Sequence, residues 1–242
     1  MADFTVLLRK LNALHALSEE EQGALLESIS VVRELAKGEN IVDDGGEPKQ
    51  STVILSGVAC RYKILADGRR QILAFQFPGD VTDLYSYVLK KMDHGVGCLT
   101  PCQIAHIPHE ALERLCARYP NLAYTLWRDS LVDAAILNMA IVNNGRRSAI
   151  ERIAHLLCEQ YARLLAVGLA ERGRPVSFNI TQTDVADATG LSLVHVNKTL
   201  RKFKDQELLR MVQGKLVVLD WKGMREAADF DQAYLHFKNV EL

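Results

Sequence analysis

The chain has 242 residues, of which 48% are hydrophobic and 24% charged, and its formal net charge is −1. This balance excludes a disordered or fibrous protein, and the length favours two modest domains over one large core. Its longest apolar stretches are too short and too interrupted to span a bilayer, so we expect neither a membrane segment nor a signal peptide. Five scattered cysteines indicate a reducing compartment, and we expect a cytoplasmic protein.

The first part of the chain predicts short helices that lead into an all-β module. Apolar residues recur at helical spacing over residues 3–35, and Ser18 precedes an acidic first turn. Between residues 32 and 107, short apolar runs alternate with glycines, a texture typical of strands joined by turns. Asp67-Gly68 separates two such runs, as in a hairpin turn whose glycine adopts positive φ.

A long helix is predicted over residues 121–144. Its second half, residues 131–142, is apolar on nearly every side and contains Asp133 as its only charge. One face can cover the barrel and another needs a partner, which a symmetric helix pair in a homodimer would supply. We therefore expect aspartate at Ile136 or Leu137 to split a dimer. The alternative is a helix enclosed within one domain, but no neighbouring segment is long and apolar enough to enclose it.

A domain boundary is expected after this helix. Asn143-Asn144-Gly145 is predicted to break it, and Ser148 with Glu151 forms a capping-box pattern for the next helix. The predicted division is helices plus barrel in residues 1–120, a connecting helix and hinge in 121–145, and a C-terminal domain in 146–242.

Residues 181–203 carry the strongest functional signal. Thr181 followed by Asp184 marks a helix start, Gly190 suits a tight turn, and Ser192 caps a second helix. Short apolar runs on both sides of residues 212–214 then predict a small β-hairpin, the wing of a winged helix-turn-helix.

The second of these two helices is basic. Between residues 192 and 204 there are four basic residues and no acidic one, which fits a recognition helix in a DNA major groove. Helical spacing turns Val196, Leu200 and Phe203 inward. An ordinary solvated helical hairpin is the alternative, and the wing and the upstream long helix argue against it.

Several segments, in this order, resemble the Crp/Fnr family over essentially the whole chain. They are GVACRY at residues 57–62, FPGD at 77–80, the long helix, ERIAHLL at 151–157 and the helix-turn-helix. The resemblance implies an α+β fold with an N-terminal double-stranded β-helix (jelly-roll) sensor domain, a dimerisation helix and a C-terminal winged helix-turn-helix. It implies a bacterial transcription regulator and no enzyme, with promoter DNA, RNA polymerase and a second copy of the chain as partners.

The resemblance also implies individual DNA contacts. Ser192 would bind backbone phosphate, while Val194, Asn197 and Lys198 occupy positions that usually read bases. Val194 replaces a glutamate of relatives and can touch a thymine methyl, and Lys198 stands where arginine is common, so the half-site sequence stays open. The predicted DNA-binding set is Thr181, Gln182, Thr183, Ser192, Val194, His195, Asn197, Lys198, Arg201 and Lys202.

The groups with which relatives bind cyclic AMP are missing. Asp83 follows the FPGD run, no arginine stands near Asp93, and Leu137-Asn138 takes the helix position in an ungapped comparison. No cysteine precedes Cys60, so we also expect no N-terminal iron–sulfur cluster. The cofactor is unknown, and a small-molecule effector pocket is expected near the barrel mouth, with Asp83, Tyr85, Asp93, His94 and Asn138.

Other candidate sites are weaker. Cys98 and Cys102 are four residues apart and could form a redox pair. We favour the interpretation that both are simple core residues. His94, His106 and His109 lack a metal-ligand pattern, so no metal is predicted. The chain contains no His-x-His, which argues against a cupin-like metalloenzyme. A ligand-binding subunit without DNA activity is opposed by the basic helix.

Overall fold

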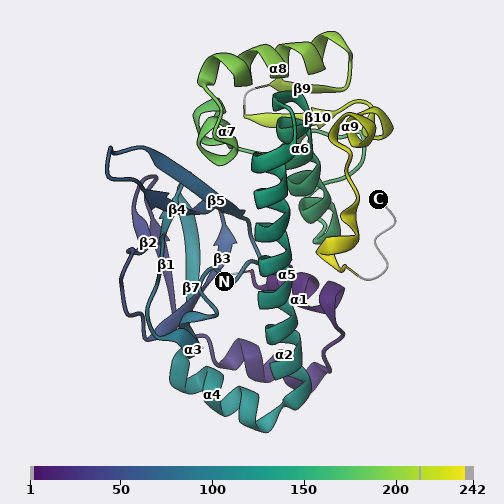
Figure 1. The fold of residues 1–242 in the computed structure, drawn as a ribbon. Helices are drawn as coiled ribbons and strands as arrows, with labels where there is room; N and C mark the ends of the chain where they lie inside the picture. Colours follow the sequence, from purple (N-terminus) through teal and green to yellow (C-terminus); the bar gives the residue numbers. More distant parts are fainter. Residues whose placement is uncertain (1–2, 213, 238–242) are drawn as a thin grey trace.

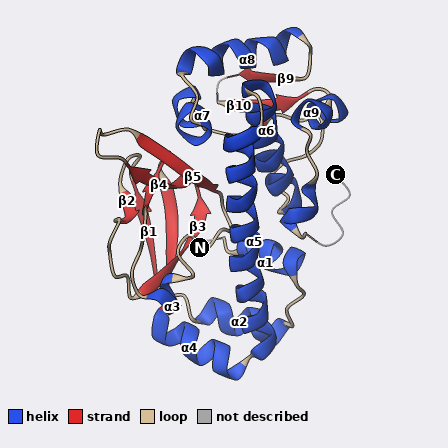
Figure 2. Cartoon of the chain, viewed as in Figure 1, coloured by secondary structure: helices blue, strands red, loops and turns tan. Residues whose placement is uncertain are grey.

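The computed structural model describes residues 3–212 and 214–237, and its architecture is the predicted α+β one. A β-barrel lies beside the long helix α5 (Pro120–Arg146), and a second, mainly helical part lies at the C-terminal end of α5 (Figure 1). The strands gather in two places, the barrel and a small sheet under α8 (Leu193–Asp205), as Figure 2 shows. None of the helices in the described ranges is both long and apolar enough to cross a membrane.

The N-terminal segment forms α1 (Thr5–Leu14), α2 (Glu19–Glu27) and the strand β1 (Val31–Leu35). The predicted cap at Ser18 is confirmed, because its side chain accepts from the backbone N–H of Glu21 and the Glu21 carboxylate accepts from the Ser18 backbone N–H. The helical spacing expected up to residue 35 is wrong for β1. This strand pairs antiparallel with β7 (Cys102–Pro108), and tertiary pairing outweighs the local pattern.

The barrel consists of two antiparallel sheets, with strand orders β1-β7-β3 and β2-β6-β4-β5. The predicted hairpin turn at Gly68 is confirmed, since this glycine has a φ of 85° and its N–H donates to the Leu65 carbonyl. The remaining elements of this part are β2 (Asn40–Val42), β3 (Gln50–Ser56), β4 (Ala59–Ile64), β5 (Arg70–Gln76), α3 (Ser86–Leu89), β6 (Gly95–Cys98) and α4 (His109–Arg118).

Helix α5 continues through Gly145 and ends at Arg146, so the break predicted at residues 143–145 is wrong. A glycine inside a helix costs only about 1 kcal/mol, and the Asn143 side chain, which donates to the Arg152 carbonyl, binds this last turn to the next helix. The capping box of Ser148 and Glu151 is confirmed and begins α6 (Ala149–Ala166).

The C-terminal part contains the predicted helix pair and a three-stranded sheet of order β8-β10-β9. Strands β9 (Leu209–Val212) and β10 (Lys215–Val218) are the two arms of the predicted wing, and Gln213 between them lies outside the described residues. The third strand was not predicted, because β8 (Val176–Ser177) has only two residues. The other elements are α7 (Gln182–Thr189), α9 (Trp221–Ala228) and the 3₁₀ helix η1 (Gln232–Leu235).

Candidate DNA interface and sensor site

Local hydrogen bonds fix the start and end of the first helix in the predicted helix-turn-helix. The Thr181 hydroxyl accepts from the Asp184 backbone N–H at 3.1 Å, and the Asp184 carboxylate accepts from the Thr181 backbone N–H at 2.9 Å. Gly190 ends α7 in the left-handed conformation at φ 66°, and Ser192 then caps α8. A residue with a Cβ would be strained at Gly190, so the turn between the helices depends on this glycine.

Helix α8 separates apolar and basic side chains as predicted. Val196, Leu200 and Phe203 are buried in the C-terminal core. The opposite side lies at the outer end of the molecule, far from the barrel (Figure 1). Each of the ten residues in the predicted DNA-binding set is exposed: Thr181, Gln182, Thr183, Ser192, Val194, His195, Asn197, Lys198, Arg201 and Lys202.

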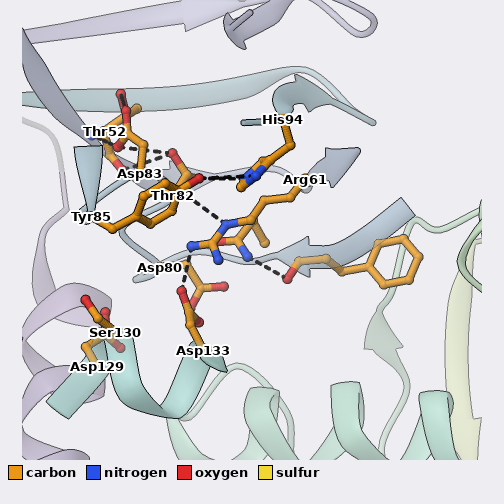
Figure 3. A network of polar contacts seen from close by, with 12 residues as sticks. Thr52, Arg61, Asp80, Thr82, Asp83, Tyr85, His94, Asp129, Ser130 and Asp133 are labelled. Carbon is orange, nitrogen blue, oxygen red and sulfur yellow. Dashed lines mark hydrogen bonds and ion pairs between the residues drawn. The ribbon is translucent and has the colours of Figure 1, made fainter. Parts of the chain in front are cut away.

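Four of the five residues expected in an effector pocket lie together at the barrel, and three of them, Asp83, Tyr85 and His94, are labelled in Figure 3. The Tyr85 hydroxyl is 2.7 Å from His94 Nε2, and His94 Nδ1 is 2.7 Å from the Asp93 carboxylate. The Asp83 carboxylate accepts from the Thr52 backbone N–H at 2.6 Å. Burial raises the pKa of Asp83 to about 7 and lowers the pKa of His94.

The fifth residue, Asn138, does not join this cluster. It is exposed on α5, whereas Ser130 and Asp133 of the same helix lie on the side that faces the barrel (Figure 3). The ungapped comparison therefore placed the wrong turn of α5 against the site. The register of a helix against a barrel depends on loop lengths and packing, which spacing along the sequence does not give.

Arg61 is the central residue that sequence reasoning missed. It extends from β4, donating from Nε to the Thr82 carbonyl at 2.9 Å and from Nη2 to the Asp133 carboxylate at 2.5 Å. Its guanidinium lies 5.6 Å from the centre of the Tyr85 ring. The chain around Asp93 contains no arginine, but the fold brings Arg61 of β4 against the Tyr85 ring of the same cluster. The available signal was weak: Asp133 is the only charged residue of the apolar stretch 131–142, and Arg61 is the first charged residue of β4.

A second buried ion cluster joins the barrel to both neighbouring parts. Asp80, which follows β5, pairs with Lys10 of α1 at 2.9 Å and with Arg163 of α6 at 2.7 Å. Lys10 also pairs with Asp129 of α5 at 2.7 Å. Burial alone would raise the pKa of Asp80, but the charges of Lys10 and Arg163 hold it below its ordinary value. The cluster thus ties α1, the barrel, α5 and α6 together.

Two cysteines and three histidines of the barrel region are buried. Cys98 and Cys102 are buried side by side in one apolar cluster of the barrel, and both are free thiols. His94, His106 and His109 are buried as well. Within residues 3–212 and 214–237, no three histidine, cysteine or acidic side chains gather in a way that could hold a metal ion. The fold and the exposed basic helix together define a winged helix-turn-helix protein with an N-terminal barrel.

Known proteins give this class a family. A model of the Crp-like helix-turn-helix domain matches residues 151–227, and a model of the cyclic nucleotide-binding domain matches residues 32–119. The nitrogen fixation regulation protein FixK of Bradyrhizobium diazoefficiens is 30% identical over 168 residues, 69% of each chain. The transcriptional activator protein FnrL of Cereibacter sphaeroides is 26% identical over 225 residues, 90% of this chain and 89% of its own.

Solved structures agree on the fold. The structure of FixK2 from Bradyrhizobium japonicum superposes with a TM-score of 0.73 at 23% identity and covers 81% of this chain and 96% of its own. The chain belongs to the Crp/Fnr family of transcription regulators, with a helix-turn-helix DNA-binding domain and a cyclic nucleotide-binding-like domain. Its relatives are transcription regulators and not enzymes.

Proposed function

We propose that the protein binds a pseudo-palindromic promoter site as a homodimer and acts on RNA polymerase under the control of a signal received by its barrel. The proposed units are a sensor domain (1–120), a dimerisation helix and hinge (121–145) and a DNA-binding domain (146–242). The observation that carries the proposal is α8, whose outward face is basic and whose residues 193–204 contain no acidic side chain. Such a face is suited to phosphates and base edges in a major groove.

The exposed side of α5 supports the dimer. Seven of its exposed positions follow one another in steps of three and four residues, which is the seam pattern of a two-stranded coiled coil, and the exposed Val142 and Arg146 lie directly beside two of them. Leu122, Leu126, Val132 and Ile136, between these positions, are buried against the rest of the same chain. A second α5 is the occupant that such a seam fits. The seam positions are Tyr124, Trp127, Leu131, Ala134, Asn138, Ile141 and Gly145.

Lys198→Ala and Arg201→Ala are expected to weaken DNA binding in different ways. Half-sites about 34 Å apart would each receive one α8. Lys198→Ala should relax specificity and cost about 1–3 kcal/mol if Lys198 contacts a base, whereas Arg201→Ala should weaken all sequences alike and lower the salt slope by about 1. Selection from random duplexes, followed by anisotropy titration at several salt concentrations, measures both effects.

Lys63→Ala is the matched control for these variants, because it removes the same charge from the barrel strand β4. We expect it to bind DNA as the wild type does. If selection recovered no two-fold-related consensus, or if Lys198→Ala and Arg201→Ala both bound normally, the assignment of α8 would be wrong. A ligand-binding protein without DNA activity would then take its place.

We expect that neither cyclic AMP nor an N-terminal iron–sulfur cluster controls this protein. The Arg61 guanidinium is already bound by Asp133 and the Thr82 carbonyl, and Asp83 lies beside it. An incoming phosphate would have to displace the partly buried Asp133 carboxylate from its buried cation. The effector pocket that we propose instead is formed by Asp83, Tyr85, Asp93 and His94.

Calorimetry of the purified protein with cyclic AMP should therefore show no binding at micromolar concentration, and cyclic AMP should leave the affinity for the selected duplex unchanged. Micromolar binding of cyclic AMP that also tightens DNA association would overturn the expectation.

A further inference from the structure

The hairpin of β4 and β5 contacts the first helix of the helix-turn-helix directly. Arg70, the first residue of β5, places Nε 2.8 Å from the Asp187 carboxylate and Nη2 2.6 Å from the Asp184 carboxylate. The neighbouring Gln71 side chain donates to the Ala188 carbonyl at 3.2 Å. Figure 1 shows α7 next to this end of β5. The barrel is therefore linked to the C-terminal part in two ways. The chain connects them through α5, and Arg70 and Gln71 contact α7 directly.

The contact neutralises two carboxylates close to the proposed DNA interface. Asp184 uses one carboxylate oxygen in the capping box with Thr181 and offers the other to Arg70, so the two interactions compete for no atom. The Arg70 fork spans Asp184 and Asp187, a geometry suited to arginine and not to lysine. Without Arg70, two uncompensated negative charges would remain on the helix that begins with the exposed residues 181–183.

Other bonds keep α7 folded without Arg70. The C-terminal end of α7 is also held by Asn144 of α5, which donates to the Ala188 carbonyl, and by Arg152 of α6, which donates to the Thr189 carbonyl. The ion pairs of Arg70 are partly exposed, with 29% of its side chain accessible. Partly exposed pairs contribute little to folding stability, so the main effect of Arg70 concerns the charge and orientation of α7.

We propose that Arg70 is a positioning residue for DNA binding, which acts from the sensor barrel through Asp184 and Asp187. It holds the helix-turn-helix in a fixed orientation to the barrel and shields DNA phosphates from the two carboxylates. Both effects have the same sign, since each favours the DNA complex. This inference rests on the proposed DNA interface, and it gives a signal at the barrel a route to α8 through the hairpin.

Arg70→Ala should weaken binding to the duplex that the wild type selects by roughly tenfold, within the range of typical couplings between sites. Arg69→Ala is the matched control, because Arg69 is the adjacent arginine and, among the described residues, its side chain pairs with Asp67 of the same turn. It should bind nearly as the wild type does. Arg70→Lys should recover part of the loss, since it keeps the charge without the fork.

A double-mutant cycle with Asp187→Asn distinguishes shielding from a loss of folding. Asp187→Asn in the Arg70→Ala background should restore the part of the affinity that is lost through repulsion by Asp187, so the two effects should be non-additive. A partly unfolded protein would not recover in this way. The part of the Arg70→Ala defect that comes from repulsion of phosphates should also shrink as salt rises.

Three results would overturn the inference while leaving the proposed function intact, provided that the wild type binds its duplex. They are equal affinities of the Arg70→Ala and Arg69→Ala variants, an additive cycle, and tighter binding by Arg70→Ala, which would make the contact an inhibitory one. A wild type that selects no duplex at all would instead overturn the proposed function, and this inference with it.

Discussion

Ile141→Asp is expected to convert the protein from a dimer into a monomer at micromolar concentration. Ile141 lies at a seam position of α5 and is 71% exposed in the single chain. Formation of the dimer would therefore bury two Ile141 side chains, one from each protomer. Burial of an isoleucine side chain stabilises by about 1.5–3 kcal/mol. Its loss in both protomers should raise the dimer dissociation constant by at least roughly a hundredfold. Sedimentation velocity over a concentration series measures the change.

Leu65→Asp is the matched control, because it places the same charge on another exposed apolar residue, in the hairpin and away from α5. This variant should stay dimeric. Ile136→Asp, which the sequence pattern suggests as a dimer test, would disturb the protomer core, where only 6% of Ile136 is exposed. A wild type that sediments as a monomer at micromolar concentration would remove the premise of the seam.

The helix-turn-helix was largely predictable because its signals are local. Thr181 and Asp184 are three residues apart and cap each other, Gly190 supplies the one left-handed turn, and Ser192 caps α8. Each of these contacts depends on neighbours within one turn of helix, so residue type and spacing were sufficient. The same holds for the hairpin turn at Gly68.

The candidate sensor site was less predictable because its contacts join distant segments. Arg61 and Asp133 are 72 residues apart, and nothing in either local pattern indicates the pairing. The exposed Asn138 was expected against the barrel for the same reason, since the register of α5 follows from packing. β1 shows the converse effect, in which pairing with β7 overrides a helical pattern in the local sequence.

Asp80→Asn is expected to destabilise the protein by about 3–5 kcal/mol, the usual cost of removing one partner from a buried ion pair. The Asp80 side chain is 7% exposed, and its loss of charge would leave Lys10 and Arg163 without their shared carboxylate. Asp44→Asn is the matched control, because Asp44 pairs with Lys63 at the surface and should cost no more than about 1 kcal/mol. Urea unfolding at pH 7 compares the three proteins.

The pH dependence of the Asp80 effect has a definite sign. The folded pKa of Asp80 lies below its ordinary value of 3.8, so the stabilising charge is present above that value and is lost as the pH falls through the folded pKa. The difference between wild type and Asp80→Asn should therefore be largest near neutral pH and shrink progressively in acid below pH 4. An equal difference at pH 7 and in strong acid would show that Asp80 stabilises the junction by hydrogen bonds alone, and not by its charge.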